Sequence, residues 1–127
     1  MSMACTDDQK NRFLKPFLAD HRYVMGRGIT EPNAGSDLAN LGCKAELDGD
    51  QWVISGQKIW TSSGHLANMV FVLARTDPDV PTHKGISFLL VPMDQPGVEV
   101  RPITNIVRHD HFNEVFFTNA NCPKEAV

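Results

Sequence analysis

The chain has 127 residues, the length of one ordinary domain, and its 12 basic and 15 acidic residues leave a net charge of -3. The two signs are mixed along the sequence, which excludes the basic stripe of a nucleic-acid-binding or anionic-membrane surface. Its three cysteines are well separated, which argues against a disulfide framework or a zinc site. Because we find no membrane span, signal peptide or presequence, we expect a cytoplasmic protein, or a mitochondrial or peroxisomal one in a eukaryote.

A short helix is predicted near the N-terminus. Thr6 and residues 7–9 (DDQ) match a capping box, with acids where the helix dipole favours them. An apolar stripe follows at Phe13, Leu14, Phe17 and Leu18. We expect this stripe to pack on a neighbouring helical domain, and Pro16 to end or kink the helix near Leu14 or Lys15.

The next segment ends in a loop whose composition suits an anion. Residues 28–37 (GITEPNAGSD) leave an extended run and must turn before Leu38. Gly35 permits close backbone approach and Ser36 adds a hydroxyl donor, so the loop can receive a phosphate or pyrophosphate oxygen. Taken alone, the same composition favours an ordinary surface turn.

From Tyr23 onward, short runs rich in Val, Ile, Phe and Thr alternate with turn residues, which is typical of an antiparallel all-β domain. Seven strands are predicted, near residues 23–30, 42–47, 52–60, 69–76, 86–92, 98–103 and 114–118. Residues 48–50 (DGD) indicate a hairpin between the second and third strands. The pattern predicts a small antiparallel barrel or a sandwich, and periodicity does not separate the two.

A second loop pairs an aromatic plane with hydroxyls. In residues 56–64 (GQKIWTSSG), Trp60 ends an apolar run and is followed by Thr61, Ser62 and Ser63. An indole can stack on a planar heterocycle while a hydroxyl or backbone donor bonds its polar edge. Taken alone, the second loop favours a core tryptophan before a polar turn, but the two loops in this order are less easily explained by chance.

Several polar residues invite a catalytic or metal-binding interpretation that the pattern does not favour. Glu31 and Asp37 flank the first loop, but carboxylates within turns more often bond nearby backbone donors. His109 and His111 with Asp110 could bind a metal, yet no further cluster completes a ligand set, and a solvated loop is favoured. Residues 78–84, with His83 and Lys84, could touch the phosphates of a ligand, although a surface hairpin is the simpler expectation.

The two loops together resemble the acyl-CoA dehydrogenase family. A T-E-P-x-A-G-S-D segment and a G-Q-K-x-W segment occur in this order in the middle β-domain of that family. Four later segments also resemble strands of that domain: residues 69–77 (MVFVLARTD), 84–92 (KGISFLLVP), 96–102 (PGVEVRP) and 113–117 (NEVFF). The resemblance extends from about Phe13 to Pro123, and it favours the barrel over the sandwich.

The resemblance implies a division of the chain and of its parent protein. Residues 1–21 would be a remnant of an N-terminal helical domain, and residues 22–127 the middle β-domain. Family enzymes are longer and add a C-terminal helical domain, so this chain resembles an excised middle portion. The parent would be a homo-oligomer, with acyl-CoA as substrate.

The resemblance also implies roles for individual residues toward FAD. Arg27 and Gly28 would begin the flavin-binding stretch, while Ile29 and Thr30 would lie against the pyrimidine side of the ring. Gly28 departs from the bulky residue of many members, as Asn33 does from glycine.

Further along, Gly35 and Ser36 would meet the pyrophosphate, and Ser36 would also contact the acyl-CoA substrate. Trp60 would cover the flavin ring, Ser62 would bond N5, and Thr61 would contribute its backbone.

The implied function is the FAD- and acyl-CoA-binding part of an enzyme that introduces an α,β double bond into an acyl thioester. No catalytic residue is assigned, because the family's base is a glutamate of the C-terminal domain, and the chain alone is expected to be inactive. Two alternatives remain open. One is a non-catalytic, stand-alone β-barrel binding module, and the other is the equivalent domain of a related flavin oxidase or monooxygenase.

Overall fold

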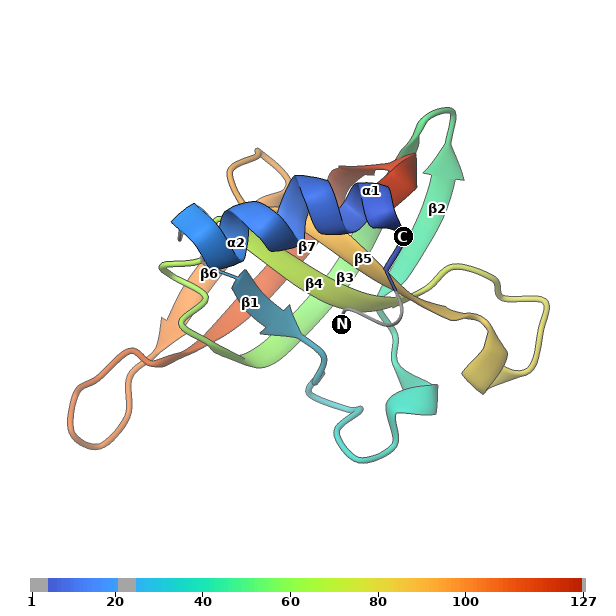
Figure 1. Cartoon of the computed structure of the whole chain (residues 1–127). Helices are drawn as coiled ribbons and strands as arrows, with labels where there is room; N and C mark the ends of the chain where they lie inside the picture. The colour runs from blue at the N-terminus through green and yellow to red at the C-terminus, as the bar shows by residue number, and fades with distance from the viewer. Residues whose placement is uncertain (1–4, 21–24, 127) are drawn as a thin grey trace.

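The computed structural model describes residues 5–20 and 25–126 as a helical segment and seven strands, as predicted (Figure 1). The strands are β1 (Met25–Gly28), β2 (Lys44–Asp48), β3 (Gln51–Ser62), β4 (Met69–Arg75), β5 (Ile86–Pro92), β6 (Val98–Ile103) and β7 (Phe112–Pro123). Short 3-10 helices lie at Leu38–Asn40 (η2), Thr82–Lys84 (η3) and Lys124–Ala126 (η4). The predicted start of the first strand and the predicted domain boundary after residue 21 lie outside the described residues.

The strands form one curled sheet, a half-barrel in which the order is β1-β4-β2-β3-β7-β6 and β5 also pairs with β4. The β2–β3, β3–β7, β4–β5 and β6–β7 pairs are antiparallel, as predicted. The pairs that β4 makes with β1 and β2 are parallel, which differs from a purely antiparallel sheet. The β1–β4 pair is parallel because β4 does not follow β1 through a tight turn. The chain first forms the β2–β3 hairpin, and β4 then runs beside β1 in the same direction.

The β2–β3 hairpin forms where residues 48–50 indicated it. Asp48 pairs with Gln51, and Gly49 adopts φ +61°, a left-handed conformation that glycine reaches without a steric cost. The tight turn fixes the register of β3, the strand that leads into the second loop.

The helical segment comprises α1 (Asp7–Gln9), a π-helical turn η1 (Lys10–Leu14) and α2 (Lys15–Asp20). The capping box is present, because Gln9 N–H donates to Thr6 Oγ1 and Thr6 N–H donates to Gln9 Oε1. Of the two effects expected of Pro16, an end or a kink of the helix, the end does not occur, because α2 continues to Asp20. The wider π turn just before Pro16 changes the bonding pattern where a proline N–H is missing.

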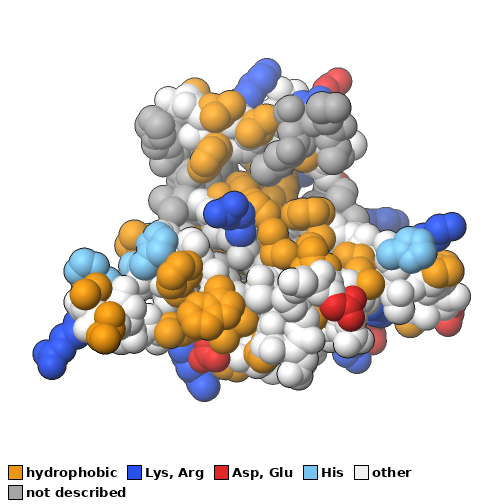
Figure 2. Space-filling model, turned by 90° about the horizontal axis from the view of Figure 1, so that it is seen from below, with side chains coloured by type: hydrophobic (Ala, Val, Ile, Leu, Met, Phe, Trp, Pro, Cys, Tyr) orange, Lys and Arg blue, Asp and Glu red, His pale blue; other side chains and the backbone are white. Residues whose placement is uncertain are grey.

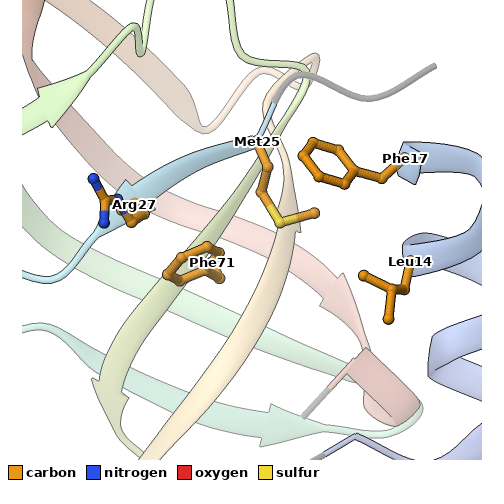
Figure 3. Close-up of a pocket in the computed structure, with 5 residues that line it drawn as sticks. All are labelled: Leu14, Phe17, Met25, Arg27 and Phe71. Carbon is orange, nitrogen blue, oxygen red and sulfur yellow. The ribbon is translucent and has the colours of Figure 1, made fainter. Parts of the chain in front are cut away.

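The apolar stripe of the helix faces the sheet of this chain. Phe13 packs against the core cluster, and Leu14 and Phe17 face Met25 and Phe71 across a pocket (Figure 3). Leu18 remains 64% exposed. The strands β4, β5 and β7 supply most of the core cluster. Buried residues largely alternate with less buried ones in β4 and β7, whereas β5 buries Leu89, Leu90 and Val91 in succession.

Candidate functional site

The two loops singled out in the sequence, residues 28–37 and 56–64, lie side by side. Ile59 N–H in β3 donates to the Thr30 carbonyl at 2.9 Å, so the end of the first strand is bonded to the outer part of the third. We call these two segments the two-loop site. Figure 2 views the molecule from the end where the first loop projects, and hydrophobic side chains gather on that face.

A β-bulge turns Trp60 outward. The register between β3 and β7 shifts between Lys58 and Thr61, which leaves Ile59 and Trp60 opposite Glu114. Trp60 adopts φ +60°, a left-handed conformation that is strained for any residue other than glycine. Bulges next to functional sites commonly re-aim a side chain, and here the indole is 54% exposed.

The Trp60 indole is in contact with a second aromatic ring. The Phe112 ring meets the Trp60 ring edge-on with centroids 5.8 Å apart, and His111 stacks edge-on against Phe112 at 4.9 Å. Ser63 N–H donates to the His111 carbonyl at 2.7 Å, which joins the second loop to the β6–β7 loop. Sequence patterns do not connect Phe112 and His111 with Trp60, because the register of β7 against β3 brings them together.

Beneath the loops lies a buried ion pair, Glu31–Lys58. Lys58 Nζ donates to Glu31 Oε1 at 2.7 Å, and the Lys58 and Glu31 side chains are 0% and 9% exposed. The Glu31 carboxylate also accepts the N–H groups of Gly42 at 2.6 Å and Cys43 at 2.9 Å. We call Glu31, Lys58 and these backbone donors the floor of the two-loop site.

These contacts decide the charge of Glu31. Burial alone would raise the pKa of the carboxyl, but the hydrogen bonds from Lys58, Gly42 and Cys43 outweigh it and hold the pKa below 4.5. Glu31 bonds backbone donors, as predicted, but these belong to Gly42 and Cys43 and not to its own turn. The role of Lys58 was missed, although it shares the buried face of β3 with Ile54 at an even spacing.

The rim of the site consists of Thr30, Trp60 and Ser62. Their side chains are exposed or half-buried. Within the described part of the chain, the Thr30 and Ser62 hydroxyls are not engaged in any hydrogen bond. The rim therefore combines an open aromatic face with hydroxyl donors that are free for a ligand.

The other predicted site residues are spread around the rim. Ile29 is half-buried and its carbonyl accepts a hydrogen bond from Lys58 Nζ at 3.3 Å. Gly35 and Ser36 lie further along the first loop, exposed, beyond the turn closed by the Glu31–Ala34 bridge. The Thr61 side chain is fully buried, and its carbonyl accepts from Asn113 Nδ2 at 3.2 Å.

The structure does not bring the side-chain positions of Arg27 and Gly28 to the rim. Gly28 faces inward, and a Cβ there would lie 3.3 Å from Lys58 Cγ and from Val72 Cγ2. A bulky residue at this position would have to displace both neighbours. Arg27 instead lines the pocket of about 230 Å³ between the helix and β4 (Figure 3).

The remaining candidates lie in exposed loops. The Asp110 carboxylate accepts from the Thr104 hydroxyl at 2.7 Å, and His83 and Lys84 lie in the exposed η3 turn. Among the described residues, no group of three His, Cys, Asp or Glu side chains is placed to hold a metal ion. The cysteines are free, and burial raises the pKa of Cys43 to about 11 and that of Cys122 to about 12.

Comparison with known proteins identifies relatives over nearly the whole chain. The model of the acyl-CoA dehydrogenase middle domain matches residues 26–120. The chain is 52% identical over 122 residues to the acyl-CoA dehydrogenase IpdE1 of Mycobacterium tuberculosis, with 96% of this chain and 31% of that protein covered. It therefore spans about a third of the length of this curated relative. None of the described helices has the length and apolarity to cross a membrane.

Two solved structures show the same fold. The ChsE4-ChsE5 complex of Mycobacterium tuberculosis matches with a TM-score of 0.85 at 37% identity, covering 96% of this chain and 31% of that chain. A glutaryl-CoA dehydrogenase of Mycobacterium smegmatis in complex with FADH2 matches with a TM-score of 0.80 at 34% identity, covering 96% and 30%.

Proposed function

The chain belongs to the acyl-CoA dehydrogenase family through its middle domain, and on that premise we propose that it binds FAD and an acyl-CoA thioester as part of an acyl-CoA dehydrogenase. Its substrate would be an acyl thioester that loses hydrogen across the α and β carbons. One relative of similar fold is in complex with FADH2, which supports the choice of cofactor.

The observation that carries the proposal is the convergence of the two loops. The hydrogen bond from Ile59 to Thr30 brings an exposed indole beside free hydroxyls, while the buried pair below fixes the backbone of both loops. An isoalloxazine is a flat ring with polar edges, so the chemistry of the rim fits it. The strained backbone at Trp60 is also typical of residues held for a ligand.

FAD held by these residues would supply the acceptor for the hydride lost from the substrate β-carbon. The residues of this chain bind and orient the reactants. Trp60 covers one face of the ring and excludes water, and the Thr30 and Ser62 hydroxyls donate to its polar edge. Ile29, Thr61 and the backbone of Arg27 and Gly28 complete the wall of the cofactor site, Gly35 and Ser36 receive the pyrophosphate, and Ser36 also contacts the thioester substrate.

The proton from the substrate α-carbon goes to a base outside this chain. Glu31 is unsuited to that task, because its carboxylate is buried in three hydrogen bonds and held ionised at the floor. The relative IpdE1 of Mycobacterium tuberculosis is about three times as long as the chain, which leaves room for further domains, and we propose that a helical one of these supplies the base. The complex formed by one relative supports an oligomeric parent, which we propose is a homo-oligomer in the cytoplasm or an organelle matrix.

Flavin content and turnover test the proposal. The protein is expressed from its complete natural reading frame and assayed for bound flavin and for reduction of an electron-accepting dye by a panel of acyl-CoA thioesters. We expect bound FAD and an α,β-unsaturated thioester as product. A protein that takes up no flavin when FAD is added contradicts the proposal.

Flavin retention by the isolated chain is a separate expectation. We expect it to retain flavin weakly or not at all, because only one wall of the site belongs to it. A tightly bound yellow flavin on the isolated chain would contradict this expectation without contradicting the function.

A further inference from the structure

Asn113 occupies a buried position where an apolar residue would be expected. Residues 113, 115 and 117 of β7 share one face of the strand, and Val115 and Phe117 belong to the core. Asn113 is 0% exposed. Burying an amide costs free energy unless its hydrogen bonds are satisfied, so this residue needs a specific explanation.

The amide of Asn113 bonds three segments that surround the Trp60 bulge. Nδ2 lies 3.2 Å from the Thr61 carbonyl, 3.3 Å from His65 Nδ1 and 3.5 Å from the His111 carbonyl. These partners belong to the end of β3, to the β3–β4 turn and to the β6–β7 loop. Rotating the amide to exchange its ends would set its oxygen against two carbonyl oxygens, so the NH2 group must face them.

The arrangement leaves one atom without a partner. Asn113 Oδ1 accepts no hydrogen bond within the described part of the chain, and Thr61 Oγ1 is also buried without a partner there. Gly64 closes over the amide, since a Cβ at that position would lie 3.2 Å from Asn113 Cβ. The site therefore tolerates an unsatisfied acceptor in order to keep the two donors of the amide.

The bonded carbonyl belongs to the residue that follows the bulge. Trp60 holds φ +60°, and a strained conformation persists only where its surroundings fix it. On one side the Ile59–Thr30 bond fixes the bulge, and on the other the Asn113–Thr61 bond does. Without the second bond, the bulge is free to relax toward regular strand geometry.

We infer that Asn113 is a positioning residue, whose buried amide holds the Trp60 bulge and so aims the indole and the Ser62 hydroxyl at the flavin. The identity of the ligand rests on the proposed function, while the control of the bulge rests on geometry alone. Asn113 touches neither flavin nor substrate, and it acts through the backbone of Thr61.

The first test examines the bulge without any ligand. Asn113→Asp keeps the shape of the side chain and removes its two donors, and Asn121→Asp is the matched control because Asn121 lies exposed on the same strand. Isotope-labelled chains are compared by NMR, with the chemical shifts and couplings of Trp60 reporting the sign of φ, and by thermal unfolding. We expect Asn113→Asp to shift the resonances of residues 60–62 and lose the positive φ, and the control to leave both unchanged.

The second test examines the flavin. FAD affinity is measured for both variants in the complete natural reading frame, where neighbouring domains complete the site. Losing the donors should weaken FAD binding about tenfold in Asn113→Asp, as expected for a hydrogen bond or two. The control should stay within about twofold, the change expected of an exposed residue away from the site.

The outcomes separate this inference from the proposed function. If Asn113→Asp alters the Trp60 signals but the unmodified protein binds no FAD, the positioning role holds and the function fails. If the unmodified protein binds FAD and Asn113→Asp matches it in both the Trp60 signals and affinity, the inference is wrong.

A second variant covers the risk that a buried aspartate prevents folding. Asn113→Ser is small and neutral and is judged by the same two measurements. If neither variant folds, the inference is also contradicted, because the residue would then serve the whole fold and not the bulge.

Discussion

The floor of the two-loop site, where Glu31 meets Lys58, is buried and hydrogen-bonded, whereas the rim at Thr30, Trp60 and Ser62 is open and leaves its hydroxyls unpaired. Both regions come from the same two loops, and Lys58 is two residues from Trp60. In a regular strand these two residues would point to the same side, but the bulge between Lys58 and Thr61 turns Trp60 outward, so one segment builds both regions. Substitutions at the floor should therefore change mainly stability, and substitutions at the rim mainly ligand binding.

The largest effect is expected at the floor. Lys58→Met leaves the Glu31 carboxylate buried without its cation, and breaking a buried pair in this way costs about 3–5 kcal/mol. Urea unfolding measures the loss. Lys44→Met is the matched control, because Lys44 pairs with Glu46 at the surface and should change stability little. An equal loss of unfolding free energy in the two variants would mean that the buried Glu31–Lys58 pair stabilises the protein no more than a surface pair does.

The pH dependence of stability tests the same region. A carboxyl whose pKa is lowered by folding stabilises the protein above its ordinary value of 4.5, and this contribution is lost as pH falls through the folded-state pKa. We therefore expect the stability difference between the unmodified protein and Glu31→Gln to be largest near neutral pH and to shrink in acid. Unfolding curves over a pH series measure it, with Glu46→Gln as the surface control. A difference that stays constant across the series argues against an ionised floor.

At the rim, a change of residue should affect binding more than folding. Trp60→Gly and Trp60→Ala both remove the indole and should weaken FAD binding about tenfold. Only glycine also relieves the left-handed backbone, so Trp60→Gly should be more stable than Trp60→Ala by about 1 kcal/mol. Thermal unfolding and FAD titration provide the two measurements. Should alanine prove the more stable of the two, the left-handed backbone at Trp60 would be in doubt.

The smallest effects are expected from single hydroxyls. Thr30→Val and Ser62→Ala should each cost about 1 kcal/mol of FAD binding, or roughly fivefold in affinity, with little change in stability. Thr118→Val is the control, since Thr118 is an exposed threonine on β7. Affinities that match the control would remove these hydroxyls from the proposed contacts.

Local signals in the sequence predicted much of the fold. The seven strands, the capping box at Thr6 and the hairpin at Gly49 were all predicted, because each depends on neighbouring residues. The parallel pairing of β1 with β4 was not, since it depends on where a distant strand returns. The helix was expected to end at Pro16 because helix propensities do not show that a preceding π turn can accommodate a proline.

As with the fold, only part of the candidate site was predicted from the sequence. Trp60 and its hydroxyl neighbours were found from composition, and the family resemblance supplied their proposed roles. The Glu31–Lys58 pair and the contacts of Asn113 join residues far apart in the chain, so they required the register of β3. The left-handed backbone of Trp60 follows from a bulge that periodicity does not mark.

We propose that the two loops form one wall of a flavin site with Trp60 as its aromatic face. A crystal structure of the protein from its complete natural reading frame, grown with FAD, tests this most directly. We predict the flavin ring in van der Waals contact with the Trp60 indole, with the Thr30 and Ser62 hydroxyls at its polar edge. Electron density for FAD that lies away from both loops would contradict the account.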